Sequence, residues 1–421
     1  MEPVFATWGA VGALALAILL IVRRMPPAYA LIFAALAGGL AGGGGLAQTV
    51  EAMTDGAKGM MPAVLRILAS GVLAGALIRT GAAARLADAI VGGLGARFAL
   101  AAVALATMVV CAVGIFVDIA VITVAPIALA VGRRADVPVP ALLLAMVGGG
   151  KAGNIVSPNP NTIAAADAFK VDLTALILEN AIPALVALAM TIALATLVAR
   201  SRRGRYDVSA DMVPTGGADA ARPSLWAALA GPIVVVALLV LRPIAGVAVD
   251  PMIALPAGGL AALLATGHIR SAVPFTEFGL SKVAGVAVLL VGTGTLAGII
   301  KASGLNADMI SLMKLCHLPT FALAPVSGVL MAGATASTTA GATVASQTFA
   351  STLLSAGVPA VSAAAMIHAG AIVLDSLPHG SFFHATGGAV SMPFGERLRL
   401  VPYDALVGLA ATLAATVQYV I

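Results

Sequence analysis

The feature that most constrains this chain is its succession of long apolar segments, separated by short stretches that hold most of the charged residues. Many segments continue for about 20 residues, the length that an α-helix needs to cross a bilayer core. They are apolar on all sides, whereas the strands of a membrane β-barrel alternate apolar and polar residues. Because 61% of the residues are hydrophobic and 10% are charged, a water-soluble fold of this length could not bury its apolar surface. The sequence therefore predicts an all-α polytopic membrane protein. The apolar segments lie at about 8–22, 28–47, 61–80, 98–131, 141–170, 176–199, 225–241, 246–266, 284–303, 320–354, 360–392 and 401–421.

Basic residues next to these segments predict which ends face the cytoplasm. If every segment crossed the bilayer once, these residues could not all lie on one side. They can if segments 98–131 and 320–354 are re-entrant hairpins, whose arms of about 12–15 residues are too short to span comfortably. About ten crossing segments of a plasma-membrane protein then remain, with both termini outside. The basic residues expected in the cytoplasm are Arg23, Arg24, Arg79, Arg85, Arg97, Arg133, Arg134, Arg200–Arg205, His268, Arg270, Arg397 and Arg399.

An internal repeat relates the two halves of the chain. Gly71–Gly81 and Gly294–Gly304 begin with the same Gly-x-Leu-Ala-Gly pattern, end on glycine and lie 223 residues apart. The charge rule makes the first of them run inward and the second outward, so the halves have inverted topology, as in many secondary transporters. We expect an N-terminal repeat at 1–199, a cytoplasmic linker at 200–224 and a C-terminal repeat at 225–421, with about five spans in each repeat.

Each predicted hairpin has a polar tip at membrane depth, where lipid does not tolerate unpaired polar groups. The first tip, Gly114–Asp118, ends in a carboxylate. The second tip, Gly333–Gly341, is rich in hydroxyl groups, which together with free backbone suit a cation or a carboxylate. Packing between helices through small residues is the alternative for this tip. The candidate substrate ligands in it are Thr335, Ser337, Thr338 and Thr339.

Two further segments, at about 141–170 and 360–392, are predicted to be broken helices. In the first, Gly148–Thr162 cannot be continuous helix, because Pro158 and Pro160 lack donors and the glycines permit turns. Amides at the broken helix ends suit an anion, although an extramembrane loop is the alternative. The candidate substrate ligands here are Lys151, Asn154, Ser157, Asn159, Asn161 and Thr162, and Lys151 either binds a substrate carboxylate or pairs internally with Asp118 or Asp375.

The second broken segment contains the strongest site signal, because Asp375–Gly388 combines a carboxylate, two imidazoles and several hydroxyls around Pro378. Its candidate substrate ligands are Ser376, His379 and Ser381. Carboxyl groups in protein interiors and imidazoles can exchange a proton near neutral pH. The candidates for binding the coupling ion are therefore Asp118, Asp375, His379 and His384. His368 lies before the break and is expected to be a packing residue with satisfied ring nitrogens.

Other functional classes find little support in the sequence. His379 and His384 have the wrong context for a metal site, because Pro378 breaks the helix that would align them. The sequence contains no HExxH, GxSxG or P-loop pattern, so we expect neither an enzyme nor a bound metal or cofactor. The Arg200–Arg205 cluster directly follows an apolar span and does not indicate binding to nucleic acid. A passive channel remains an alternative within membrane transport.

Four stretches resemble the GntP-type gluconate permease family, within the wider ion-transporter superfamily that also holds citrate and dicarboxylate carriers. They are GAKGMMPAVLRILASGVLAGALIRTGAAARLA (56–87), GIFVDIAVITVAP (114–126), GNIVSPNPNTIAAADAF (153–169) and DSLPH (375–379).

The resemblance implies secondary active, proton-coupled symport of gluconate or a related hydroxy-carboxylate. It also implies an elevator-type movement of a transport domain against a dimeric scaffold, and hence a homodimer in the bilayer. Sodium- or metal-coupled transport of citrate or a dicarboxylate is the alternative. Asp118 stands where the family leads us to expect glutamate. Gluconate, citrate and 3-hydroxybutyrate therefore all remain candidate substrates.

Overall fold

The computed structural model describes residues 4–201, 222–305, 307–308, 311, 315, 319–378 and 380–421. Within these residues the regular structure is helical, apart from one isolated bridge between Phe5 and Ser303, so the predicted all-α class is confirmed. The helices are α1 (Thr7–Val22), α2 (Pro27–Ala41), α3 (Leu46–Lys58), α4 (Met61–Arg79), α5 (Ala82–Leu94), α6 (Ala99–Ala112), α7 (Val117–Arg134), α8 (Val139–Ile155), α9 (Pro160–Phe169), α10 (Leu173–Glu179), α11 (Ala181–Arg200), α12 (Leu225–Ala245), α13 (Pro251–Ala265), α14 (Ala272–Lys301), α16 (Leu323–Thr335), α17 (Thr338–Ser355), α18 (Ala360–Ala371), α19 (Ser381–Ala389) and α20 (Phe394–Val420).

Five stretches of helix in the described chain are long and apolar enough to cross a membrane, and several shorter apolar helices accompany them. The five are Met61–Arg79, Val139–Phe169, Ala181–Arg200, Ile269–Lys301 and Phe394–Val420. The helices that coincide with the arms of the two predicted hairpins are not among them. These are α6 and α7, with 14 and 18 residues, and α16 and α17, with 13 and 18 residues. The re-entrant course of these arms stays a prediction.

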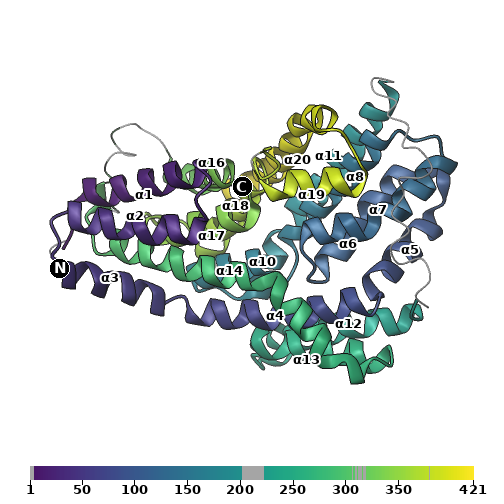
Figure 1. The fold of residues 1–421 in the computed structure, drawn as a ribbon, viewed down its shortest axis with the longest axis horizontal. Helices are drawn as coiled ribbons and strands as arrows, with labels where there is room; N and C mark the ends of the chain where they lie inside the picture. Colours follow the sequence, from purple (N-terminus) through teal and green to yellow (C-terminus); the bar gives the residue numbers. More distant parts are fainter. Residues whose placement is uncertain are drawn as a thin grey trace.

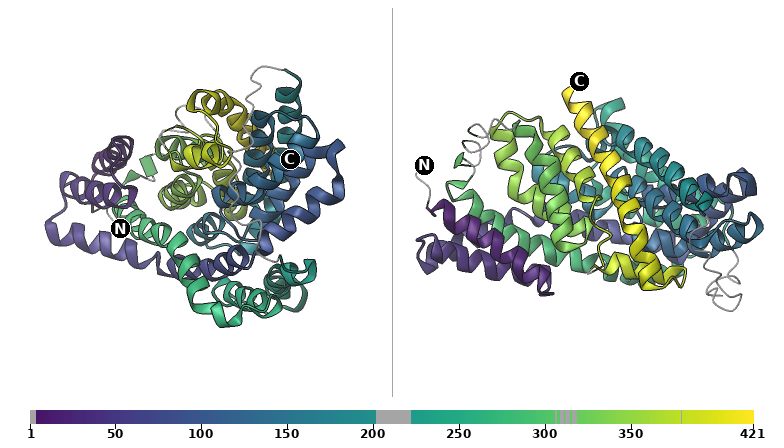
Figure 2. Two further views of the ribbon diagram at one scale, coloured as in Figure 1. Left: turned by 45° about the vertical axis from the view of Figure 1, so that its right-hand side comes forward. Right: turned by 90° about the horizontal axis from the view of Figure 1, so that it is seen from above.

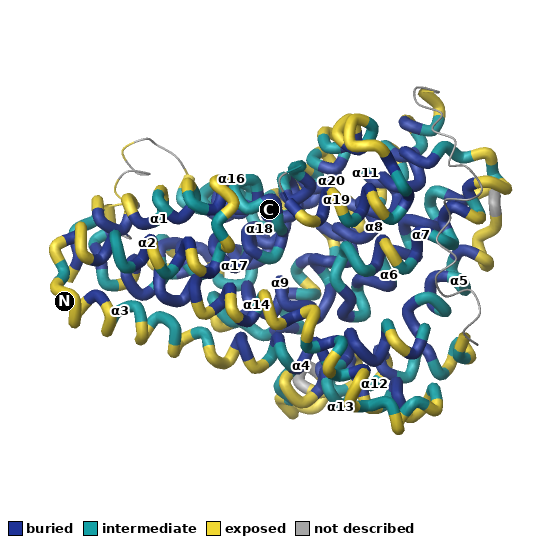
Figure 3. Tube along the Cα trace, viewed as in Figure 1, coloured by how far each residue is buried: buried dark blue, intermediate teal, exposed yellow. Residues whose placement is uncertain are grey.

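Helices from both halves of the chain interleave at the centre of the molecule. α14 crosses the structure and packs against α2, α3 and α4, as Figure 1 and Figure 2 show. α9, from the first half, packs against α17 and α18 from the second, and α11 packs against α20. Burial is greatest in this central region (Figure 3), where all 17 residues of α8 are buried. A polar group on α8 is therefore held by protein and shielded from solvent.

The glycines of the first broken segment do not form a turn, contrary to expectation. α8 continues through them to Ile155, and the break is confined to 156–159. A Cβ at Gly149 would lie 2.1 Å from the carbonyl oxygen of Ala104 in α6, and one at Gly153 would lie 2.2 Å from that of Met108. These glycines let the backbones of α6 and α8 touch, as small residues do between membrane helices.

The other helix breaks fall at the polar interruptions of the sequence. The chain leaves helical structure at 113–116, at Ala336–Ser337 and at 372–380. Ala336 has a left-handed backbone with φ 45°, and the Ser337 side chain accepts a hydrogen bond from the Ala340 amide to begin α17. Ser157 donates to the carbonyl oxygen of Cys111 at 2.7 Å, which ties the break after α8 to α6.

Candidate functional site

An ion pair joins the two halves of the chain in the protein interior. The Nζ of Lys151, in α8, lies 2.7 Å from Oδ1 of Asp375, in the non-helical segment after α18. Both side chains are buried. Thr338, in the first turn of α17, donates a 2.6 Å hydrogen bond to Oδ2 of Asp375. These contacts bring together both predicted broken segments and the tip of the second predicted hairpin.

Every N–H donor of the Lys151 ammonium has a protein acceptor. Besides Asp375, the ammonium donates to the carbonyl oxygens of Ile372 at 2.7 Å and Asp404 at 3.1 Å. An ammonium group has three donors, so none is left for a ligand. Ser376 donates to Oδ1 of Asp375 at 3.1 Å and completes the network. Of the two roles expected for Lys151, this structure shows the internal pairing with Asp375.

Three asparagines and a threonine fix the break between α8 and α9. Oδ1 of Asn159 accepts hydrogen bonds from the amides of Asn161 at 2.9 Å and Thr162 at 3.2 Å, which caps α9. Nδ2 of Asn159 and Nδ2 of Asn161 both donate to Oδ1 of Asn154, at 2.7 and 3.0 Å. All four side chains are buried. Oδ1 of Asn161 accepts no hydrogen bond within the described residues.

A second buried ion pair adjoins the Lys151 network. Nη1 of Arg397 lies 2.6 Å from Oδ2 of Asp404, whose carbonyl oxygen is the one that accepts from Lys151. The Arg397 guanidinium also stacks over the Phe383 ring, at 5.2 Å from its centroid. Only 1% of Arg397 is exposed, so its charge lies inside the protein, while its cytoplasmic side stays a prediction. A clue to this pair is that Arg397 and Asp404 are seven residues apart, which puts both on one helix face.

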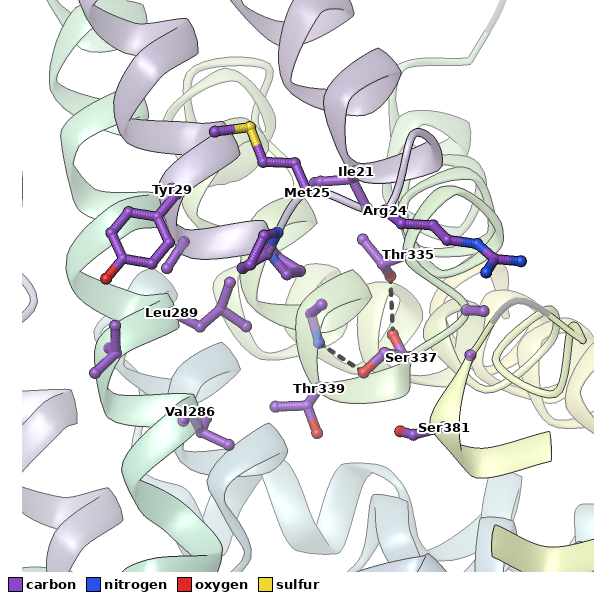
Figure 4. Close-up of a pocket in the computed structure, with 18 of the residues that line it drawn as sticks. Ile21, Arg24, Met25, Tyr29, Val286, Leu289, Thr335, Ser337, Thr339 and Ser381 are labelled. Carbon is purple, nitrogen blue, oxygen red and sulfur yellow. Dashed lines mark hydrogen bonds between the residues drawn. The ribbon is translucent and has the colours of Figure 1, made fainter. Parts of the chain in front are cut away.

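A cavity of about 760 Å³ lies beside the second hairpin tip and the second broken segment. Its polar wall carries Thr335, Ser337, Thr339 and Ser381, and Figure 4 shows this wall on the right together with Arg24. The opposite wall in Figure 4 is apolar except for the hydroxyl of Tyr29, and it consists of Tyr29, Val286 and Leu289. Such a cavity suits a small molecule with both polar and hydrocarbon parts.

Most of the predicted site residues fall into two groups. Thr335, Ser337, Thr339, Ser381 and His384 line the cavity. The buried networks behind it hold Lys151, Asn154, Asn159, Asn161, Thr162, Thr338, Asp375 and Ser376. Ser157 is buried in the first break, and Asp118 lies half-buried in the first turn of α7.

The three histidines of segment 360–392 differ in what the structure shows of them. His384 is exposed and lines the cavity, and its Nε2 lies 2.9 Å from the carbonyl oxygen of Pro378. His379 lies outside the described residues. His368 is fully buried in α18, but neither ring nitrogen has a hydrogen-bond partner in the described chain, so the expectation of satisfied nitrogens is wrong.

Sequence reasoning missed two groups of charged residues. The charge rule predicts only a cytoplasmic position for Arg24, yet this residue lines the cavity. Arg66 of α4 pairs with Asp167 of α9 and with Asp250, which precedes α13. Apolar surroundings and a lone charge within a span are the signal that could have drawn attention to Arg66 and Asp167.

Comparisons with known proteins agree with this architecture. A family model described as GntP family permease matches residues 5–387. A Haemophilus influenzae protein named "Uncharacterized transporter" is 52% identical over 411 residues, which are 98% of this chain and 97% of that protein. Another protein of that organism, named "Uncharacterized permease", is 29% identical over 166 residues, 39% of this chain and 34% of its own length. The crystal structure of the Alcanivorax borkumensis YdaH transporter has a similar fold, with a TM-score of 0.60 at 17% identity, covering 87% of this chain and 86% of that one.

Proposed function

This chain belongs to the GntP family of permeases and is a multi-pass protein of the plasma membrane, and on that premise we propose that it is a proton-coupled symporter of a small hydroxylated organic anion. A gluconate-like sugar acid or a related hydroxy-carboxylate is the proposed substrate. The observation that carries the proposal is the cavity beside the second hairpin tip. Hydroxyl groups from that tip and from the start of α19 line one wall of it, where they can bind the hydroxyls and carboxylate of such an anion.

The buried pair behind the cavity supports proton coupling. As long as Asp375 is ionised, it neutralises Lys151 in the interior. A proton bound to Asp375 would leave the lysine charge buried without a counter-ion, which is strongly unfavourable. An anion bound nearby would restore the balance, so proton and anion favour each other's binding. This reciprocity is what symport requires. Asp118 and His384 are further proposed proton sites, and His379 is a fourth.

Sodium coupling is the second candidate, and the break between α8 and α9, at 156–159, favours it. Oδ1 of Asn161 is a buried neutral oxygen that accepts no hydrogen bond within the described residues. Neutral amide, hydroxyl and carbonyl oxygens are the ligands that hard cations take. A sodium ion in this break would place its charge beside the Asn154–Asn159 cluster. Citrate or a dicarboxylate would then be the substrate to test first.

We propose an elevator mechanism, in which the predicted hairpins and broken segments move together. The packing of α9 against α17 and α18, and of α6 against α8, supports a common moving unit. α4 packs against both α13 and α14, and these three helices are the proposed scaffold, which borders the moving unit where α4 meets α9 and α14 meets α17. A homodimer formed through the scaffold is part of the proposal. The inverted repeats at 1–199 and 225–421 give the two hairpins opposite directions of entry.

Uptake into proteoliposomes tests the function. Proteoliposomes that contain the purified protein should accumulate labelled gluconate, 3-hydroxybutyrate or citrate when their lumen is more alkaline than the outside buffer. A protonophore should abolish this accumulation. A sodium gradient at equal pH should drive uptake only if the second candidate is right. Equilibration without accumulation under either gradient would instead identify a passive channel. Failure of all three anions to enter would contradict the proposed substrate class.

A further inference from the structure

A carboxylate in the cavity needs a cation, and the interior does not supply one. The three donors of Lys151 are taken by Asp375, Ile372 and Asp404. Arg397 is buried against Asp404, and neither Lys151 nor Arg397 lines the cavity. The polar wall offers neutral hydroxyls and the imidazole of His384. Hydroxyls alone bind an anion weakly compared with a charged donor.

Arg24 is the arginine that lines this cavity, within the part of the chain that the structure describes. It belongs to the connection between α1 and α2, and it forms no ion pair with another described residue. A guanidinium has five N–H donors in a planar fork that matches a carboxylate. Figure 4 shows the Arg24 side chain starting near Thr335 and extending outward, so the exposed guanidinium must turn inward to meet an anion held by Ser337 and Ser381.

The backbone holds Arg24 in an unfavourable conformation. Its φ is 67°, in the left-handed region where glycine is normally found. The Met25 amide donates to the carbonyl oxygen of Leu20 and the Arg24 amide to that of Ile21, which is the Schellman arrangement at a helix end. Glycine is the residue that this position favours. Arginine occupies this position although glycine would be less strained, and its side chain lines the cavity.

We infer that Arg24 is the residue that recognises the substrate carboxylate, and this inference rests on the proposed function. The Schellman turn and the following Pro26 and Pro27 fix its backbone before the anion arrives. The guanidinium then binds the carboxylate at the polar wall, while Thr335, Ser337 and Ser381 bind the hydroxyl groups. Arg24 therefore sets the preference for anions over uncharged analogues.

Substitution of Arg24 by glycine separates binding from folding. Arg24→Gly relieves the left-handed strain, so the thermal midpoint of the detergent-solubilised protein should stay unchanged or rise. Its dissociation constants for gluconate, 3-hydroxybutyrate and citrate, measured by isothermal titration, should increase by about tenfold or more for each anion that the wild type binds. Arg24→Lys keeps the positive charge but lacks the planar fork of donors, so its dissociation constants should lie between those of the wild type and Arg24→Gly.

Arg23→Gln is the matched control, because it removes the same charge from the same connection. Arg23 is exposed and does not line the cavity, so its variant should bind anions as the wild type does. Equal affinity of Arg24→Gly and wild type would overturn the inference and leave the proposed function intact. An equal loss in both variants would show a general charge effect and would also overturn it. Absence of binding by the wild type would overturn both the inference and the proposed substrate class.

Discussion

At the scale of single residues, Lys151 and Asp375 stabilise the fold only as a pair. Lys151→Ala removes the cation and leaves Asp375 buried with two hydroxyl donors. Loss of one partner of a buried pair costs about 3–5 kcal/mol. We therefore expect a large drop in the thermal midpoint and in the monodisperse fraction on size-exclusion chromatography.

The double variant Lys151→Met with Asp375→Asn removes both charges, and asparagine still offers Thr338 an acceptor. It should recover most of the lost stability, because no uncompensated charge remains in the interior. The double variant should still show no proton-driven uptake, because it lacks the carboxylate of Asp375. A Lys151→Ala protein as stable as the wild type would contradict the structure, since the carboxylate would then need another partner.

The pairing of Lys151 shows what residue-level sequence reasoning can reach. The sequence identifies the polar residues of the site, because a charged side chain between apolar flanks is costly in a membrane and indicates a functional site. The choice between ligand and internal partner was not, because it depends on three acceptors that come from distant parts of the chain. Arg24 was missed for the same reason. A basic residue at a helix end satisfies the charge rule whether or not it also borders a cavity.

At the scale of helices, the contact between α6 and α8 depends on Gly149. A methyl group there would meet the Ala104 carbonyl at 2.1 Å, so Gly149→Ala must push the two helices apart. Overpacking of this kind costs about 1–3 kcal/mol. A Cβ added at Gly92, in α5, would have nothing within 4 Å, so Gly92→Ala should be neutral or raise the thermal midpoint slightly. Similar midpoints for the two variants, measured by thermal unfolding in detergent, would contradict the tight packing.

The helix boundaries separate what local sequence determines from what packing determines. Pro158, Pro160 and Pro378 located two breaks, because proline removes a donor wherever it occurs. The glycines at 148–153 led to a wrong prediction of a turn, because glycine occurs both in turns and at close contacts between helices. Only the neighbouring backbone of α6 decides between these roles. The long α14 likewise begins at Ala272, twelve residues before the predicted start at 284, because polar residues such as Glu277 and Lys282 are part of the helix.

At the scale of the whole molecule, the charge rule predicts sidedness that labelling can measure. Val247, between α12 and α13, is expected outside, and Ser201, after α11, is expected in the cytoplasm. In a background with Cys111 and Cys316 replaced by serine, Val247→Cys should react with an impermeant maleimide in intact cells. Ser201→Cys should react only after permeabilisation. The reverse pattern would invert the orientation, and labelling of both in intact cells would contradict the predicted number of crossings.

Arg66 connects three helices, and this link makes stability depend on pH. It pairs with Asp167 of α9, and its Nη2 lies 2.6 Å from Oδ2 of Asp250 at the start of α13. The hydrogen bond from Arg66 lowers the pKa of Asp250 below its ordinary value, against the opposing effect of burial. The folded state therefore favours the ionised carboxylate. Its contribution to stability is present above the ordinary pKa of about 4 and is lost as the pH falls through the lowered pKa.

Asp250→Asn isolates this charge, because asparagine can still cap α13 by accepting from the Met252 amide. The variant should unfold at a lower temperature than the wild type at pH 7, and the gap should narrow as the pH falls below about 4. Because the pair is partly exposed, the effect should not exceed about 1 kcal/mol. A gap that is constant from pH 7 to pH 3 would assign the loss to altered packing at α13. In that case the carboxylate charge would contribute nothing to holding α4 and α13 together.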